Sequence, residues 1–239
     1  MIIQARGRVL AARSASSFKA GMGLLLMLWL PAALAQAEAD WQLRQEDLAT
    51  ETRVWLQPRP QGLPAFRAST VLASRLSALA ALLLDHKRSA DWVYRTREAV
   101  LLSSDGPTRG VTLVVTAMPF PLSERESVVA WTLSQDPHTL VVTLSGQAAA
   151  PAPPPHPERV RMTAIESRWT FAPRADGRVD VQFEGQGEPG GNLALPLLRD
   201  FAAAAVWEGP WRTVLALREM VGKPEYAQAQ LPFIREPAK

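Results

Sequence analysis

The stretch MPFPLSERE at residues 118–126 lies between two predicted β-strands, residues 110–118 and 127–133, and it decides how we interpret the fold. A second stretch, EPGGN at residues 188–192, joins the last predicted strand to the last long predicted helix. Proline cannot donate a backbone hydrogen bond and glycine supports tight turns, so both stretches are predicted connections. They divide the chain into a strand-rich part and one C-terminal helix.

The residues around these connections predict an antiparallel sheet. Val179, Val181 and Phe183 alternate with polar residues, which is typical of a strand that is buried on one face only. Asp105-Gly106 and Asp176-Gly177 are hairpin signals at two of the joins. The predicted strands span residues 54–57, 66–71, 94–102, 110–118, 127–133, 139–144, 159–171 and 178–184.

Two helices are predicted. Ser74 is the expected cap of the first, whose leucines recur at helical spacing up to Leu84. The second is expected from Asn192 to about Val221, with a kink at Pro210. Helical periodicity places one set of residues on a single face that we expect to point inward: Leu197, Phe201, Ala204, Glu208, Trp211 and Leu215. The sequence thus predicts an α+β helix-grip fold, in which a curved antiparallel sheet wraps around a long C-terminal helix and an internal hydrophobic cavity.

The N-terminal segment has the features of a signal peptide. Four basic residues precede an uncharged apolar run at residues 21–34, which ends in the small-residue pattern of a cleavage site near Ala35. This run is shorter than the roughly 20 residues that span a bilayer, and an uncleaved anchor is the alternative. We therefore expect a signal peptide at 1–35, a domain at 36–225, a tail at 226–239, and a periplasmic or secreted location.

Composition limits the possible classes of function. A chain of 239 residues with 47% apolar residues is long enough for one sizeable core. Without the four basic residues of the signal segment, 22 Lys and Arg remain against 23 Asp and Glu. This balance removes the electrostatic argument for binding nucleic acid. The absence of cysteine excludes disulfides and thiolate zinc sites.

From Trp41 to about Val221, the order of motifs resembles a START domain. The matching features are Trp92 after the first helix, the 118–126 turn, Trp169 in a long strand and EPGG before the last helix. Glu126 and Glu188 stand where the family usually has aspartate. The resemblance implies a tunnel that holds one lipid, sterol or similar molecule without a cofactor, gated by the 117–125 loop and the C-terminal helix.

The ligand-binding candidates follow from this resemblance and from the apolar face of the helix. For the apolar candidates, ordinary core packing is the alternative to ligand contact. The candidates are Met118, Phe120 and Leu122 in the gate, Phe201, Trp211 and Leu215 on the helix, Trp92 and Trp169 in the sheet region, and the charged residues Arg88, Arg125 and Glu208.

Two of the three charged candidates, Glu208 and Arg125, have a structural alternative to ligand contact. Glu208 lies within an apolar stripe, so it needs either an arginine partner or a polar pocket with a ligand. Arg88 and Arg125 match the oxygens of a phosphate or carboxylate head group. For Arg125, an ion pair with Glu124, Glu126 or another strand is the alternative.

Enzyme functions find little support in the sequence. His86, His138 and His156 lie in no metalloprotease motif, and no G-x-S-x-G nucleophile motif is present. The G-x-G-x-x-G pattern at 185–190 lacks the parallel strand of a dinucleotide-binding unit. We predict no catalytic residue, metal or cofactor. The predicted function is binding and carriage of a lipid or other hydrophobic molecule, with phospholipid favoured and transient membrane contact. The alternatives are a cyclase or hydratase on the same fold, and a periplasmic protein-interaction module that uses the proline-rich segment 147–158.

Overall fold

The computed structural model describes residues 41–191 and 196–238. The predicted signal peptide at 1–35 and the predicted helix cap Asn192 lie outside the described residues, as does the side chain of Leu197.

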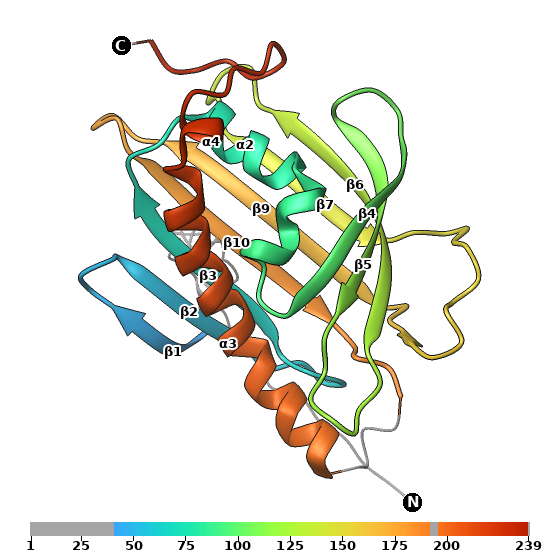
Figure 1. The fold of residues 1–239 in the computed structure, drawn as a ribbon. Coiled ribbons are helices and arrows are strands. Elements are labelled where there is room, and N and C mark those ends of the chain that lie inside the picture. The colour runs from blue at the N-terminus through green and yellow to red at the C-terminus, as the bar shows by residue number, and fades with distance from the viewer. Residues whose placement is uncertain (1–40, 192–195, 239) are drawn as a thin grey trace, which may run out of the picture. The chain divides into compact units, whose positions relative to one another are not determined.

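In the described part of the chain, ten strands form one sheet in the order β1-β2-β3-β10-β9-β7-β6-β5-β4, and the short β8 pairs with β6. All neighbours are antiparallel except β6 and β8. The strands are β1 (Gln42–Asp47), β2 (Thr52–Gln57), β3 (Ala65–Leu72), β4 (Thr96–Ser104), β5 (Arg109–Thr116), β6 (Arg125–Gln135), β7 (Val142–Ala148), β8 (Val160–Arg161), β9 (Ile165–Pro173) and β10 (Val179–Gly187). Figure 1 shows this sheet curving around the long C-terminal helix.

Both predicted hairpins are present. The β4–β5 turn contains Gly106 at φ 68° and the β9–β10 turn contains Gly177 at φ 79°, a backbone region that glycine enters without steric cost. The predicted strand 159–171 is divided into β8 and β9.

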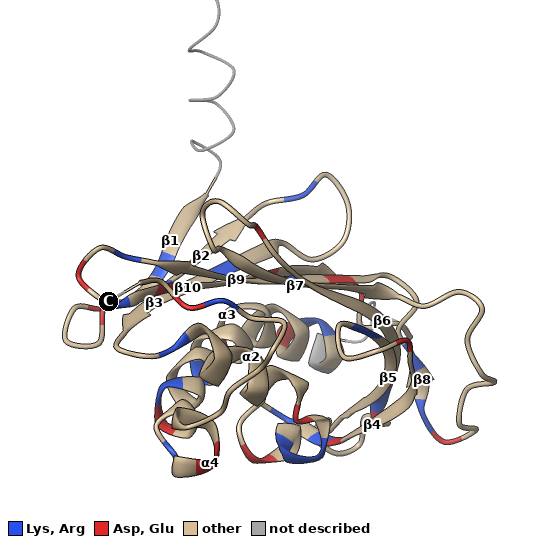
Figure 2. Ribbon diagram, turned by 90° about the horizontal axis from the view of Figure 1, so that it is seen from above, with Lys and Arg blue, Asp and Glu red and all other residues tan. Residues whose placement is uncertain are grey.

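The helices are α2 (Leu76–Leu84), the 3-10 helix η1 (His86–Asp91), α3 (Pro196–Val221) and α4 (Pro224–Ala227). Figure 2 shows that they lie together on one side of the sheet. Helix α3 continues through Pro210, which is buried within it. The predicted α+β architecture, with one long C-terminal helix held by a curved antiparallel sheet, is confirmed.

Helix α2 is capped by a residue that the sequence pattern did not predict. The carboxylate of Glu236 accepts hydrogen bonds from the backbone N–H groups of Leu76 at 3.0 Å and Ser77 at 2.8 Å. The hydroxyl of Ser74, the predicted cap, instead donates to the carbonyl of Arg75. A carboxylate also suits the partial positive charge of a helix N-terminus, so the C-terminal segment replaces the local cap.

Residues 226–238, expected as a tail, are built into the domain. Tyr226 is 3% exposed and Ile234 is 8% exposed, and both belong to the hydrophobic core. The hydroxyl of Tyr226 donates to Asp85 at 2.9 Å, and burial together with this carboxylate raises the pKa of Tyr226 to about 12. The C-terminal segment therefore stabilises the end of α2.

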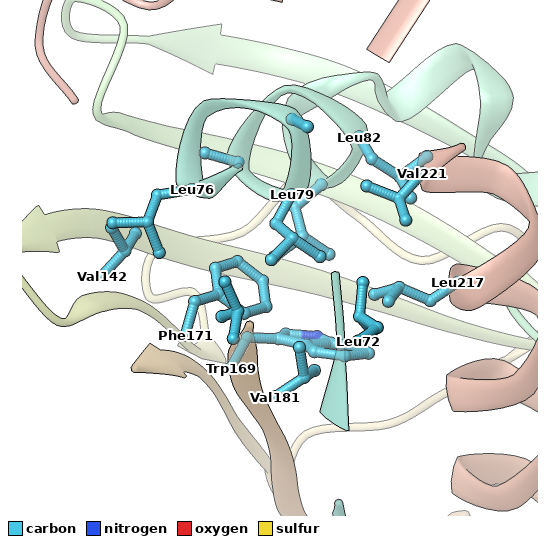
Figure 3. Close-up of a cluster of buried hydrophobic side chains, with 14 of the residues drawn as sticks. Leu72, Leu76, Leu79, Leu82, Val142, Trp169, Phe171, Val181, Leu217 and Val221 are labelled. Carbon is cyan, nitrogen blue, oxygen red and sulfur yellow. The ribbon is translucent and has the colours of Figure 1, made fainter. Parts of the chain in front are cut away.

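The core lies where α2 and α3 meet the concave face of the sheet. Figure 3 shows Leu79 of α2 above Phe171 of β9 and Val181 of β10, with Leu217 of α3 alongside. All four side chains are completely buried. Burial of one such side chain contributes about 1.5–3 kcal/mol, so this contact is a main source of stability.

We predict that Leu79→Ala lowers the free energy of unfolding by about 3 kcal/mol, because it leaves a cavity in a close-packed region. Urea unfolding followed by circular dichroism measures this. Leu48→Ala, at a side chain that is 73% exposed, is the control and should change the value by less than about 0.5 kcal/mol. Equal effects of the two substitutions would contradict this assignment of the core.

Candidate functional site

A hollow of about 440 Å³ lies between the concave face of the sheet and α3. Its size falls within the range of ligand sites, about 300–1,000 Å³. Small residues of α3, Ala202 and Ala205, form part of the wall and leave this space unfilled. The apolar lining includes Phe66, Leu83, Trp92, Met118, Val129, Trp131, Leu144, Trp169, Phe183, Phe201 and Val206.

Four aromatic rings form a continuous row along this hollow. Trp169 stacks on Phe183 with ring centroids 4.1 Å apart and an interplanar angle of 7°. Trp92 meets Trp169 edge-on at 6.1 Å, and Phe66 meets Phe183 edge-on at 4.8 Å. Each such pair contributes about 0.5–1.5 kcal/mol beyond the buried area, so the row gives the cavity a rigid apolar wall.

Arg125 is the charged residue most deeply buried in the wall, with 3% exposure. Its Nε donates to the carbonyl of Pro189 at 3.1 Å and its Nη1 donates to the carbonyl of Ser123 at 2.5 Å. These bonds connect the 117–124 loop to the EPGG stretch at 188–191. Burial lowers the pKa of the Arg125 guanidinium from its ordinary value.

Glu126 faces away from Arg125 and has its own arginine partners. It is 2% exposed and accepts hydrogen bonds from Arg161 Nη2 at 2.8 Å and from the backbone N–H of His156 at 3.0 Å. Burial alone raises the pKa of this carboxyl. The bonds to His156 and Arg161 and the charge of Arg159 outweigh burial, so the pKa lies below its ordinary value.

We predict that Glu126→Gln lowers the free energy of unfolding by about 2 kcal/mol at pH 7, because two arginines lose a charged partner. The folded-state pKa lies below the ordinary value of 4.5, so the carboxylate stabilises the fold above pH 4.5. That contribution is lost as the pH falls through the folded-state pKa.

Urea unfolding of wild type and variant between pH 7 and pH 3 measures this effect, and the two free energies should converge at the acidic end. Glu46→Gln removes an exposed pair with Arg53 and serves as the control, with an expected change below about 1 kcal/mol. A difference that stays constant over the whole pH range would contradict the assignment.

The three gate candidates occupy different environments. Met118 lines the hollow. Leu122 is half-buried outside it, in a turn where its N–H donates to the carbonyl of Pro119 at 2.9 Å. Phe120 is 95% exposed. The 117–124 loop therefore offers one side chain to the cavity and one aromatic ring to solvent.

The inner face of α3 differs from the predicted one. Phe201 lines the hollow as expected, but Trp211 and Leu215 do not line it. Trp211 is partly buried and packs against the core, and Leu215 is half-buried. The inward stripe instead contains Leu198, Ala202, Ala205, Val206, Thr213, Val214 and Leu217. Apolar residues lie on several faces of this helix, so periodicity alone did not identify the face that contacts the sheet.

Two charged candidates lie outside the hollow. Glu208 pairs with Arg212 of the next helical turn, with Oε1 and Nη2 2.7 Å apart, so the alternative of an arginine partner is the observed arrangement. Arg88 pairs with Asp91 on the surface. Of the eleven candidates, the structure brings five together around the hollow: Trp92, Met118, Arg125, Trp169 and Phe201.

His86 is the histidine that reaches the hollow. Its ring lies 5.4 Å from that of Trp131, and burial lowers its pKa despite the charge of Asp85. The indole N–H of Trp131 donates a hydrogen bond to the hydroxyl of Thr112 at 3.0 Å.

In the part of the chain that is described, no group of His, Asp and Glu side chains is arranged to hold a metal ion. No described helix is long and apolar enough to cross a membrane.

A second hollow, of about 590 Å³, has a different character. Glu184 and Arg168 line it, and along their strands these residues alternate with Phe183 and Trp169 of the inner cavity. Arg67 forms an ion pair with Glu184 at 2.7 Å and lies over the ring of Trp41. This charged lining suits a hydrophobic ligand less well than the inner cavity does.

A long helix across the concave face of a curved antiparallel sheet, with a hollow between them, defines a helix-grip fold. Among solved structures, the chain resembles the STAR-related lipid transfer protein from Xanthomonas axonopodis, with a TM-score of 0.68 and 24% identity over 77% of this chain and 99% of that one. It also resembles human STARD10, with a TM-score of 0.67 and 14% identity over 82% of this chain and 80% of that one. The TM-score with human StAR-related lipid transfer protein 5 is 0.61, with 15% identity over 79% of this chain and 91% of that one. The chain therefore has the START fold.

Sequence comparison adds one relative. An uncharacterized protein from Pseudomonas aeruginosa is 26% identical over 208 residues, which cover 84% of this chain and 98% of that protein. No family model matches the sequence.

Several lining residues were not among the predicted site residues. Phe183 could have been found, because the alternation in β10 already placed it on the buried face. Phe66 and Trp131 had no such signal, since their strands contain apolar residues on both faces.

Proposed function

We propose that this protein encloses a lipid or another hydrophobic molecule in the cavity between the sheet and α3, and that it carries this ligand after export. The observation that supports this proposal most strongly is the mainly apolar hollow of about 440 Å³ with its row of four aromatic rings. The names of two structural neighbours, both lipid transfer proteins, point the same way.

We further propose that the 117–125 loop and α3 form the gate. The loop contributes Met118 to the hollow, and the N-terminal part of α3 contributes Phe201. Arg125, the last residue of this loop and the first of β6, connects it to the segment before α3 through Pro189. A movement of the loop away from α3 would open the hollow without separating any strands of the sheet. Phe120, exposed on this loop, is suited to transient contact with a membrane.

A tryptophan on the inner face of α3 tests the site. Ala205 lines the hollow, whereas Ala203 on the same helix is exposed. We predict that Ala205→Trp fills part of the space and weakens binding of N-phenyl-1-naphthylamine, a neutral fluorescent probe, by about tenfold or more. Ala203→Trp is the matched control and should bind as wild type does.

Fluorescence titration measures both affinities, and circular dichroism confirms that both variants are folded. Equal affinity of the two variants, or no uptake by wild type, would contradict the proposed site.

The gate is tested by a change on its exposed tip. We predict that Phe120→Asp slows transfer of a fluorescent lipid from the protein to vesicles by about tenfold, because a charge replaces an apolar ring that contacts the membrane. Equilibrium binding of the neutral probe should stay unchanged, because Phe120 does not line the hollow. Stopped-flow energy transfer measures the rate. An unchanged rate of lipid transfer would show that Phe120 does not contact the membrane.

A further inference from the structure

Arg125 is a buried cation whose hydrogen-bonding capacity is only partly used. Its Nε and Nη1 donate to the carbonyls of Pro189 and Ser123. A guanidinium has five N–H donors, and within residues 41–191 and 196–238 no group accepts a hydrogen bond from Nη2. No carboxylate of the described residues forms an ion pair with this side chain, although it is only 3% exposed.

The neighbouring carboxylates are directed elsewhere. Successive residues of an extended segment point to opposite faces, so Glu124 and Glu126 lie on the face opposite Arg125. Glu124 pairs with Arg97, and with Arg159 at 3.4 Å. Glu126 pairs with Arg161 at 2.8 Å. Among the described residues, the two acidic neighbours of Arg125 in sequence, Glu124 and Glu126, therefore do not neutralise its charge, and its side chain lines the cavity.

A buried charge without a counter-ion is costly, and an anionic ligand would reduce this cost. The lowered pKa of Arg125 reflects the same burial. Its position is also suited to a head group. Nη2 lies near Gly191, where a Cβ atom would be 3.4 Å away, and the same Cβ would be 3.9 Å from Leu198. Arg125 thus lines the cavity close to the beginning of α3, and the aromatic row provides an apolar wall of the same space.

The cavity also has room for the apolar part of a ligand. Its volume of about 440 Å³ lies within the range of sites that enclose a small organic molecule, about 300–1,000 Å³. Arg125 and the aromatic row line this same space, so one ligand can contact both.

We propose that the cavity takes an amphiphile with a carboxylate or phosphate in its head group, and that this acidic group is bound by Arg125. This inference rests on the proposed function, because it names the ligand class of the same cavity. The alkyl part of the ligand lies against the aromatic row, and its acidic group serves as the counter-ion of the guanidinium.

The first test compares ligands that differ only at the head. Displacement of N-phenyl-1-naphthylamine from protein purified from cells expressing the full chain reports affinities for tetradecanoic acid, tetradecyl phosphate, tetradecanol and a diacyl phosphatidylglycerol. At least one of the two acids should bind about 10- to 100-fold more tightly than the alcohol, as expected for a hydrogen bond to a charged group. Comparison of the two acids identifies which head group is preferred.

Variants then assign the preference to one side chain. Arg125→Met should abolish the preference for acid over alcohol, and Arg125→Lys should keep part of it. The ratio of the two affinities within one variant does not depend on how much of the protein is folded. Arg53→Met removes an exposed arginine paired with Glu46 and is the matched control, with the wild-type ratio retained.

The outcomes separate the two proposals. If wild type binds the neutral probe and tetradecanol as tightly as the acids, or if Arg125→Met keeps the preference, the head-group assignment is overturned and the hydrophobic site stands. If wild type binds neither the probe nor any of the four ligands, the proposed function itself fails. Should Arg125→Met not fold, the wild-type ratio and Arg125→Lys still decide the question.

Discussion

The concave face of the sheet is strongly apolar, and α2 and α3 must keep water away from it. Where α3 contributes large side chains such as Leu217 and Met220, they fill the space down to Phe171 and form the core. Where α3 contributes Ala202 and Ala205, the same covering leaves the hollow of about 440 Å³. Core and cavity are thus two parts of one interface, and the size of the side chains on α3 separates them.

The second constraint is electrostatic and concerns three consecutive residues. Alternation along the chain turns Glu124 and Glu126 to one face, where Arg97, Arg159 and Arg161 satisfy them. The residue between them, Arg125, is turned to the cavity and connects the loop to the EPGG stretch at 188–191 through backbone carbonyls. A short motif therefore places a positive charge beside an apolar space and holds the preceding loop in position. This motif connects the fold to the proposed ligand chemistry.

The fold was largely predictable from sequence because its signals are local. The two connecting stretches and the hairpin glycines can be recognised in the sequence itself, and the resemblance to START domains predicted how the elements between them are arranged. Strand β1 was missed because Gln42–Asp47 is polar and largely exposed. The cap of α2 was missed because Glu236 comes from 160 positions further along the chain. The inner face of α3 was misassigned because that choice depends on tertiary packing, which periodicity in a helix with apolar residues on several faces does not specify.

We propose that the hollow between the sheet and α3 encloses a hydrophobic ligand. Native mass spectrometry of the purified protein, followed by denaturing extraction and identification of any released molecule, tests it most directly. We predict a complex with one bound molecule per chain, which dissociates on denaturation and releases a lipid or other hydrophobic compound. A protein that is empty after purification and stays empty after incubation with total membrane lipid would contradict it.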